Sequence, residues 1–225
     1  MIREGIFAPG EFYHLIAHGV HDITLFKNEY DFGRFLFGVL AFQAPVTIKN
    51  VGRKLQSITS IRSLKLEPEV LKEIIKKRHV AVVGFALMPK HLHLVVEERT
   101  EGGISKYMQR LLTSHSKYFG ARYGHKGHVF RGAFKAVHVE DNNQLLYLSA
   151  YVHRNPHELK KWKDKAMEYP WSSYMDYVSG NTWSDLLAPD IILKQVDTST
   201  SKEYIDFVET SGAKAESIYG ESEFE

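Results

Sequence analysis

Two histidines one residue apart are the side chains best suited to chemistry. His91 and His93 flank Leu92 within the mostly apolar residues 88–96. In a β-strand, alternate residues face the same way, so both imidazoles would project from one face, about 7 Å apart at Cα, with Leu92 buried on the other. Two imidazoles placed in this way can share one cation. Because the chain has 12 histidines, a chance pair with packed or solvated rings is the alternative interpretation.

A tyrosine and an asparagine form the second constellation. Tyr151 and Asn155 lie four residues apart, directly before Pro156. At 3.6 residues per helical turn they share a face, about 6 Å apart along the axis. If that face lies over the histidine pair, Asn155 supplies a third metal ligand and the phenol of Tyr151 lies beside the cation. The alternative is that Tyr151 continues a packing stripe from Leu148 and that Asn155 only ends the helix before the proline.

The elements that must position these residues follow from the spacing of apolar residues. The hairpin that carries the histidine pair is predicted from a buried strand over residues 79–88 and a second strand over 91–97, with Pro89-Lys90 between them. The other predicted elements are a strand at 12–17, a helix at 29–43 capped by Asn28, a short helix from Pro68, a helix at 103–122, an irregular strand at 129–139, a helix capped by Asn142 or Asn143 that stops near Asn155, and a helix at 202–210. This order favours an α+β fold, an antiparallel sheet with helices packed on one side.

Composition limits the class of protein. With 225 residues, 44% hydrophobic and 25% charged, the chain can bury an ordinary core. The absence of cysteine excludes a disulfide scaffold and a cysteine zinc site, and it fits a reducing compartment. No apolar run reaches 18 residues and no signal peptide is recognisable, so we expect no membrane span and a cytoplasmic protein.

Positive charge gathers in one segment. Although the formal net charge is only +2, residues 201–225 hold seven acidic residues and two basic ones. Residues 106–139 contain no acidic residue and seven basic ones, which are Lys106, Arg110, Lys117, Arg122, Lys126, Arg131 and Lys135. A polyanion is the natural partner of such a segment, and a solvated face is the alternative.

Five segments, in order, resemble the single-tyrosine transposases of the HUH type (His, hydrophobic residue, His), in the branch related to the REP-associated tyrosine transposases. They are MPKHLHLVV at 88–96, GISKYMQ at 103–109, GHVFRGAFK at 127–135, YVHRNP at 151–156 and YPWSSY at 169–174. The resemblance extends from about residue 12 to about residue 208. It departs at Lys90, where the family usually has asparagine, at His18-Gly19, where it has Arg-Gly, and in residues 44–75, which look like an enlarged connection.

The resemblance implies a ferredoxin-like core with the HUH pair on a central strand. It also implies one transposase domain over residues 1–200, followed at 201–225 by a short helix and an acidic tail. The expected metal ligands are His91, His93 and Asn155, with Tyr151 as the nucleophile, and Mg²⁺ or Mn²⁺ suits such a mixed site. A homodimer is possible within the family, with the tyrosine helix serving its own subunit or a partner's.

The reaction that this resemblance implies is cleavage and rejoining of single-stranded, hairpin-associated DNA. Attack by tyrosine on a backbone phosphate would leave a 5′-phosphotyrosyl bond and a free 3′ hydroxyl, so rejoining would need no ATP. Tyr147 is a rival nucleophile, but only Tyr151 has asparagine four residues later before proline. The expected DNA-binding residues are Arg131, Lys135, Lys106, Arg110 and Lys117.

Two other functions compete with the transposase. One is a non-catalytic nucleic-acid-binding module, a domesticated relative of the same fold. The other is a metal-dependent hydrolase that uses water as its nucleophile. The aromatic side chains of Phe130 and Trp171 are open to two interpretations, stacking on unpaired bases or packing in the core.

Overall fold

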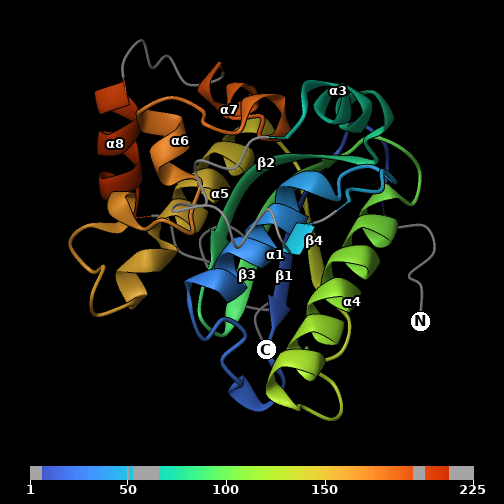
Figure 1. Cartoon of the computed structure of the whole chain (residues 1–225). Coiled ribbons are helices and arrows are strands. Elements are labelled where there is room, and N and C mark those ends of the chain that lie inside the picture. Colours follow the sequence, from blue (N-terminus) through green and yellow to red (C-terminus); the bar gives the residue numbers. More distant parts are fainter. Residues whose placement is uncertain (1–6, 50, 53–65, 195–200, 213–225) are drawn as a thin grey trace.

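A four-stranded antiparallel sheet forms the centre of the protein (Figure 1). The structure, a computed structural model, describes residues 7–49, 51–52, 66–194 and 201–212. The strands are β1 (Phe12–His18), β2 (Val80–Leu87), β3 (His91–Glu98) and β4 (Lys135–Val139), in the spatial order β2-β3-β1-β4. The HUH pair therefore lies on an interior strand, as predicted.

Helices and short 3₁₀ turns connect and cover the strands. The helices are α1 (Glu29–Ala41), α3 (Pro68–Lys77), α4 (Gly103–Tyr123), α5 (Asn142–Arg154), α6 (Tyr174–Val178), α7 (Asp190–Leu193) and α8 (Ser201–Thr210). The 3₁₀ turns are η1 (Val20–Asp22), η3 (Asn155–Glu158), η4 (Ala166–Glu168) and η5 (Ser184–Leu186). No helix within the described ranges is long and apolar enough to cross a membrane.

The predicted α+β class is confirmed, but helices cover both faces of the sheet and not one. Leu92, Leu94 and Val96 of β3 pack in the core under α1 and α4, whereas Val95 belongs to a second core shared with α5. In Figure 1, α1 and α4 lie on one side of the sheet, and α5, α6 and α8 are stacked on the other. Every residue of β2 is buried, because its apolar side chains project from both faces of the sheet into the two cores.

The predicted strand at 129–139 is shorter in the structure. Only Lys135–Val139 pairs continuously with β1, while Phe130 forms an isolated bridge with Gly19. Gly132 has a φ of +68°, which a left-handed turn requires and a strand does not allow. Part of the predicted enlarged connection (residues 53–65) and of the predicted acidic tail (213–225) lies outside the described residues.

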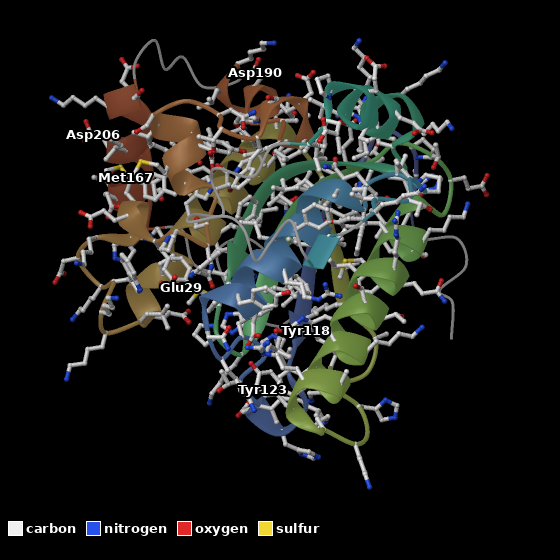
Figure 2. The ribbon with its side chains drawn as sticks, viewed as in Figure 1. Glu29, Tyr118, Tyr123, Met167, Asp190 and Asp206 are labelled. Atoms are coloured by element: carbon white, nitrogen blue, oxygen red, sulfur yellow. The ribbon has the colours of Figure 1, made fainter. Side chains whose placement is uncertain are left out.

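An aspartate joins the start of α1 to the end of α4. Asp31, fully buried, accepts hydrogen bonds from the hydroxyls of Tyr118 (2.5 Å) and Tyr123 (2.7 Å). Both tyrosines are labelled in the lower part of Figure 2, where α4 lies beside the chain that leads into α1. Asn28 caps α1 through the backbone N–H of Asp31, as its sequence position predicted. These contacts fix the layer opposite the histidine pair.

A buried glutamate caps α4 from outside the helix. The carboxylate of Glu98 accepts hydrogen bonds from the backbone N–H groups of Gly103 (3.2 Å) and Ile104 (3.0 Å), which have no partner within the helix. We expect Glu98→Ala to lower the free energy of unfolding by about 2 kcal/mol, because it removes the carboxylate acceptor of the buried Ile104 N–H and one of the two acceptors of the Gly103 N–H, which also donates to the carbonyl of Thr100. Urea unfolding measures this change. Glu101→Ala, at an exposed position nearby, is the control and should change stability by less than about 0.5 kcal/mol; equal effects would contradict the capping role.

Candidate active site

The HUH histidines begin β3 and face α5. Their ring centroids lie 5.0 Å apart with the rings perpendicular, at 89°. The side chain of His93 is buried and that of His91 is partly exposed, while Leu92 is buried on the opposite face. The predicted geometry of the pair, two rings on one face of a strand, is therefore what the structure contains.

Two further histidines of β1 join this face, and sequence reasoning did not identify them as part of the site. His18 is paired with His91 in the register of β1 and β3, and their rings stack at 5.1 Å. The Nε2 atom of His14 lies 2.9 Å from the Nδ1 atom of His93. We call the side of the sheet that bears these four rings the histidine face. The available signal was the spacing of His14 and His18, four residues apart on one predicted strand, but it required the strand register to be known.

Burial keeps these imidazoles neutral. It lowers the pKa of His91 to about 4 and that of His14 to about 3, and the pKa of His93 falls well below its ordinary value. Neighbouring charges lower these values further, through His18 at His91 and Lys135 at His14. A neutral imidazole has one nitrogen lone pair available to a cation. At neutral pH the rings are therefore in the state that metal binding requires.

Helix α5 places the tyrosine over the histidine face. Asp141 caps this helix by accepting a hydrogen bond from the backbone N–H of Gln144 at 2.7 Å, so the predicted cap at residue 142 or 143 was wrong. The ring of Tyr151 meets the ring of His93 edge to face at 5.5 Å and that of His14 at 5.9 Å. Tyrosine and histidines of the same chain thus come together without a partner subunit.

Asn155 directs its oxygen into the same space. Its Nδ2 atom donates a hydrogen bond to the backbone carbonyl of Tyr151 at 2.9 Å, which commits the amide nitrogen to the helix. The buried Oδ1 atom accepts no hydrogen bond of good geometry. The side chain is nevertheless close enough to His91 and His93 to raise the pKa of each, against the larger lowering by burial. An oxygen acceptor without a donor is therefore placed beside two imidazoles.

This donor set fits a divalent cation. Two neutral imidazoles and one amide oxygen leave room for water and phosphate oxygens, a mixture that suits Mn²⁺ or Mg²⁺. A cation would also satisfy the oxygen of Asn155, whose burial without a partner is otherwise costly. Among the described residues, no group of three or more His, Cys, Asp or Glu side chains is arranged to hold a metal ion. Asn155 is therefore essential to this assignment.

The phenol of Tyr151 is held in its protonated form in the absence of a cation. Burial raises its pKa first, and the negative charge of Glu158 raises it further, while Asn155 lowers it. Glu158 follows Asn155 in η3 and is, after His14 and His18, a further neighbour that the sequence did not identify. A positive charge beside the phenol would oppose both raising effects and favour the phenolate that attacks phosphorus.

The C-terminal helix anchors α5. His153, a fully buried residue of α5, is bonded through Nδ1 to the hydroxyl of Tyr204 and through Nε2 to that of Ser173, both at 2.8 Å. Arg154 donates to the carbonyl of Val208 at 3.0 Å at the end of α8. His153 therefore has a structural role and is not a ligand. Tyr147, the rival nucleophile, is 45% exposed and packs against Phe207 of α8.

The predicted DNA-binding cations separate into two groups. Lys135 lies opposite Ile16 on the histidine face, and the backbone N–H of Arg131 donates to the carbonyl of His18 at 2.8 Å. Both positive charges act on histidines of the site. Lys106, Arg110 and Lys117 lie instead on α4, which packs against the other face of the sheet. The basic residues of this one segment of the sequence therefore lie on two different surfaces, the histidine face and α4.

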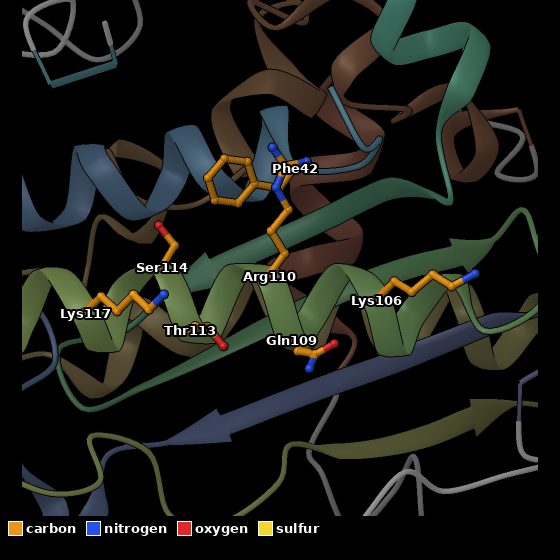
Figure 3. Close-up of a pocket in the computed structure, with 7 residues that line it drawn as sticks. All are labelled: Phe42, Lys106, Gln109, Arg110, Thr113, Ser114 and Lys117. Carbon is orange, nitrogen blue, oxygen red and sulfur yellow. The ribbon is translucent and has the colours of Figure 1, made fainter. Parts of the chain in front are cut away.

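A groove of about 520 Å³ follows the polar side of α4 (Figure 3). In that view Arg110 rises from the helix toward Phe42, whereas Lys106 and Lys117 extend along it. The guanidinium of Arg110 lies 4.3 Å from the ring centroid of Phe42 and donates to the carbonyls of Ala44 and Val46. Lys106 and Lys117 are exposed, so they are the cations of this groove that face solvent.

Phe130 and Trp171, which the sequence left open as base-stacking or core residues, both belong to the core. Phe130 is 7% exposed, and Trp171 is 9% exposed and stacks on Phe32 at 4.9 Å. A ring that is buried on this scale has little surface left for a base. Gly19, which bridges to Phe130, has no space for a side chain, because a Cβ atom would lie 2.5 Å from the carbonyl oxygen of Ile23.

Two comparisons show which known proteins the chain is similar to. The family model of IS200-like transposases matches residues 50–155, a span that contains His91, His93, Tyr151 and Asn155. The solved structure of a REP-associated tyrosine transposase bound to a REP hairpin superposes with a TM-score of 0.52 over 88% of this chain and 94% of that chain. At 12% sequence identity this second likeness is one of fold. No curated protein sequence matches the chain.

The two comparisons are independent, since one rests on sequence and the other on the arrangement of the backbone. The first points to the transposases that the five sequence motifs indicated, and the second shows a fold similar to that of one such protein. Together they confirm the resemblance that the five motifs indicated: residues 50–155 match the family model of IS200-like transposases, and the chain has a fold similar to that of a REP-associated tyrosine transposase.

Proposed function

We propose that this protein cleaves and rejoins single-stranded DNA next to a hairpin, with Tyr151 as the nucleophile. One observation carries the proposal. The Tyr151 ring lies against His93 of the same chain, beside the buried oxygen of Asn155 that has no hydrogen-bond donor. Hairpin DNA is proposed as the substrate because the structural relative is bound to a REP hairpin.

The reaction uses the residues in defined roles. The Tyr151 oxygen attacks the phosphorus, the phenol loses its proton, the bond to the 3′ oxygen breaks, and that oxygen leaves as a 3′ hydroxyl after protonation. His91, His93 and Asn155 would hold a divalent cation, which would polarise a non-bridging phosphate oxygen and stabilise the leaving oxygen. The phosphotyrosyl bond keeps the energy of the phosphodiester. A free 3′ hydroxyl of another strand can therefore displace Tyr151 without ATP.

Cations on the histidine face guide the scissile strand. Arg131 is exposed, and Lys135 lies on the same face of the sheet as the four histidines. Positive side chains at this place hold backbone phosphates near Tyr151 and do not distinguish between bases. The groove of α4, with Lys106 and Lys117, offers a second positive surface on the other layer.

A covalent adduct tests the function. The full chain is incubated with Mn²⁺ and a pool of labelled hairpin DNAs whose unpaired flanks are randomised, because the recognised flank is unknown. We expect a labelled protein band that survives a denaturing gel. Cleavage without such a band would support the hydrolase, and binding without cleavage would support the non-catalytic module; either result would overturn the proposal.

Salt dependence tests the placement of the strand. We expect Arg131→Gln and Lys135→Gln each to reduce the slope of log affinity against log salt for single-stranded DNA by about 0.7, because each change removes one phosphate contact. Fluorescence anisotropy at several salt concentrations measures the slope. Lys76→Gln, at an exposed position at the end of α3, is the matched control and should leave the slope unchanged. If the slope fell in Lys106→Gln and Lys117→Gln but not in Arg131→Gln and Lys135→Gln, the single-stranded DNA would bind along α4 and not on the histidine face.

A further inference from the structure

The imidazole of His14 lies within hydrogen-bond distance of a proposed metal ligand, His93. Its Nε2 atom lies 2.9 Å from Nδ1 of His93, and the two rings stack at 5.1 Å with 20° between their planes. Both side chains are buried, at 0% and 4% exposure. Because Ile16 is the residue directly opposite His93, His14 reaches its partner diagonally across β1 and β3. The contact engages one nitrogen of His93 and leaves Nε2 for another partner.

Only one proton fits between two nitrogens at this distance. A neutral imidazole carries one N–H group and one lone pair. If His14 donates the proton, then neutral His93 must carry its own proton on Nε2, and that nitrogen cannot bind a cation. If His93 donates from Nδ1, then Nε2 has the lone pair. The direction of this one hydrogen bond therefore decides whether His93 can be a ligand.

We propose that His14 is a positioning residue that accepts the hydrogen bond from Nδ1–H of His93 and so presents Nε2 of His93 to a divalent cation. The inference rests on the proposed function, in which His93 is a ligand. Histidine ligands in proteins commonly donate their second N–H to a carboxylate, a carbonyl or water, which fixes both the tautomer and the ring orientation. In this protein an imidazole on the neighbouring strand takes that place.

The position of His14 also gives it a contact with the nucleophile. Its ring meets the Tyr151 ring edge to face at 5.9 Å, close to the 5.5 Å between Tyr151 and His93. The three rings therefore brace one another, and the orientation of His93 is coupled to that of the phenol. Strand β1 supplies this third ring, although it carries none of the expected ligands.

The tautomer can be read directly. In the metal-free, ¹⁵N-labelled full chain, long-range ¹H–¹⁵N correlation spectra distinguish Nδ1–H from Nε2–H imidazoles. We expect His93 to be the Nδ1–H tautomer in the wild type. His14→Gln should preserve it, because the amide oxygen of glutamine can accept the same bond. His14→Leu should abolish the preference, because leucine offers no acceptor.

Mn²⁺ binding supplies the second readout, measured as free Mn²⁺ by electron paramagnetic resonance without DNA. We expect His14→Leu to weaken Mn²⁺ binding by about 10- to 100-fold and His14→Gln to restore most of it. His138→Leu removes a histidine from the opposite face of the sheet, where His138 pairs with Tyr13 in the strand register, and should change neither readout.

The outcomes separate the inference from the proposed function. An Nε2–H tautomer of His93 in the wild type, or Mn²⁺ affinity that is equal in wild type and His14→Leu, would overturn the inference alone. A wild-type chain that binds no Mn²⁺ would overturn the proposed metal site and the inference with it. If His14→Leu fails to fold, the wild-type tautomer and the affinity of His14→Gln still decide.

Discussion

Replacement of Tyr151 by phenylalanine is expected to abolish the covalent DNA adduct. The variant keeps the ring that packs against His93 and His14 and removes only the hydroxyl. Without that oxygen no phosphotyrosyl bond can form, so adduct formation should fall by at least about 1000-fold, below detection on a denaturing gel. Binding of single-stranded DNA should stay close to that of the wild type, because the cations on the histidine face are unchanged.

Tyr147→Phe is the matched control for this experiment. It changes a tyrosine of the same helix, one turn earlier, whose ring packs against Phe207 and not against the histidines. We expect this variant to form the adduct at a rate close to that of the wild type. An adduct that persists in Tyr151→Phe and disappears in Tyr147→Phe would transfer the role of nucleophile to Tyr147.

Mild acid is expected to destabilise the protein strongly. Burial lowers the pKa of His14 and His153 to about 3 and that of His91 and His115 to about 4. In the unfolded chain these groups take up protons near pH 6.5. Between pH 6.5 and pH 4 the unfolded state therefore binds more protons than the native state, and the free energy of unfolding falls as the pH falls. Each histidine contributes on the order of 2 kcal/mol of this loss at pH 5.

Urea unfolding in the presence of a chelator, at intervals between pH 7 and pH 4.5, measures the loss. The slope of the free energy of unfolding against pH should exceed that of a single proton, which is about 1.4 kcal/mol per pH unit. His153→Gln should reduce the slope by about one proton, whereas His138→Gln, at an exposed position, should leave it unchanged. A slope of one proton or less in the wild type would show that these imidazoles are protonated in the folded chain.

Much of the candidate site was accessible from local sequence. The strand from His91 and the helix through Tyr151 were predicted because apolar periodicity fixes which side chains share a face over a few residues. The spacing of Tyr151 and Asn155 likewise determined that they project together from α5. These relations depend on backbone geometry within one element, and the fold left them unchanged.

The surface on which each basic residue lies could not be predicted from local sequence. Arg131 and Lys135 form one basic run with Lys106 and Lys117 in the sequence, yet the sheet separates the two pairs. Helix α4 and strand β4 lie on different layers, so neighbours along the chain serve different surfaces. The prediction of helices on one side failed for a related reason, since apolar residues on both faces of β3 each require a cover.

By itself, the sequence determined the two chemical constellations, the elements that carry them and the resemblance to a family of transposases. Only the tertiary structure decided that the constellations meet in one chain, that His14 and His18 join them, and that the Asn155 oxygen is left without a donor. The physical reason is the range of the interactions. Periodicity acts over a few residues, whereas the pairing of β1 with β3 and the docking of α5 are set by the burial of apolar surface between residues far apart in the chain.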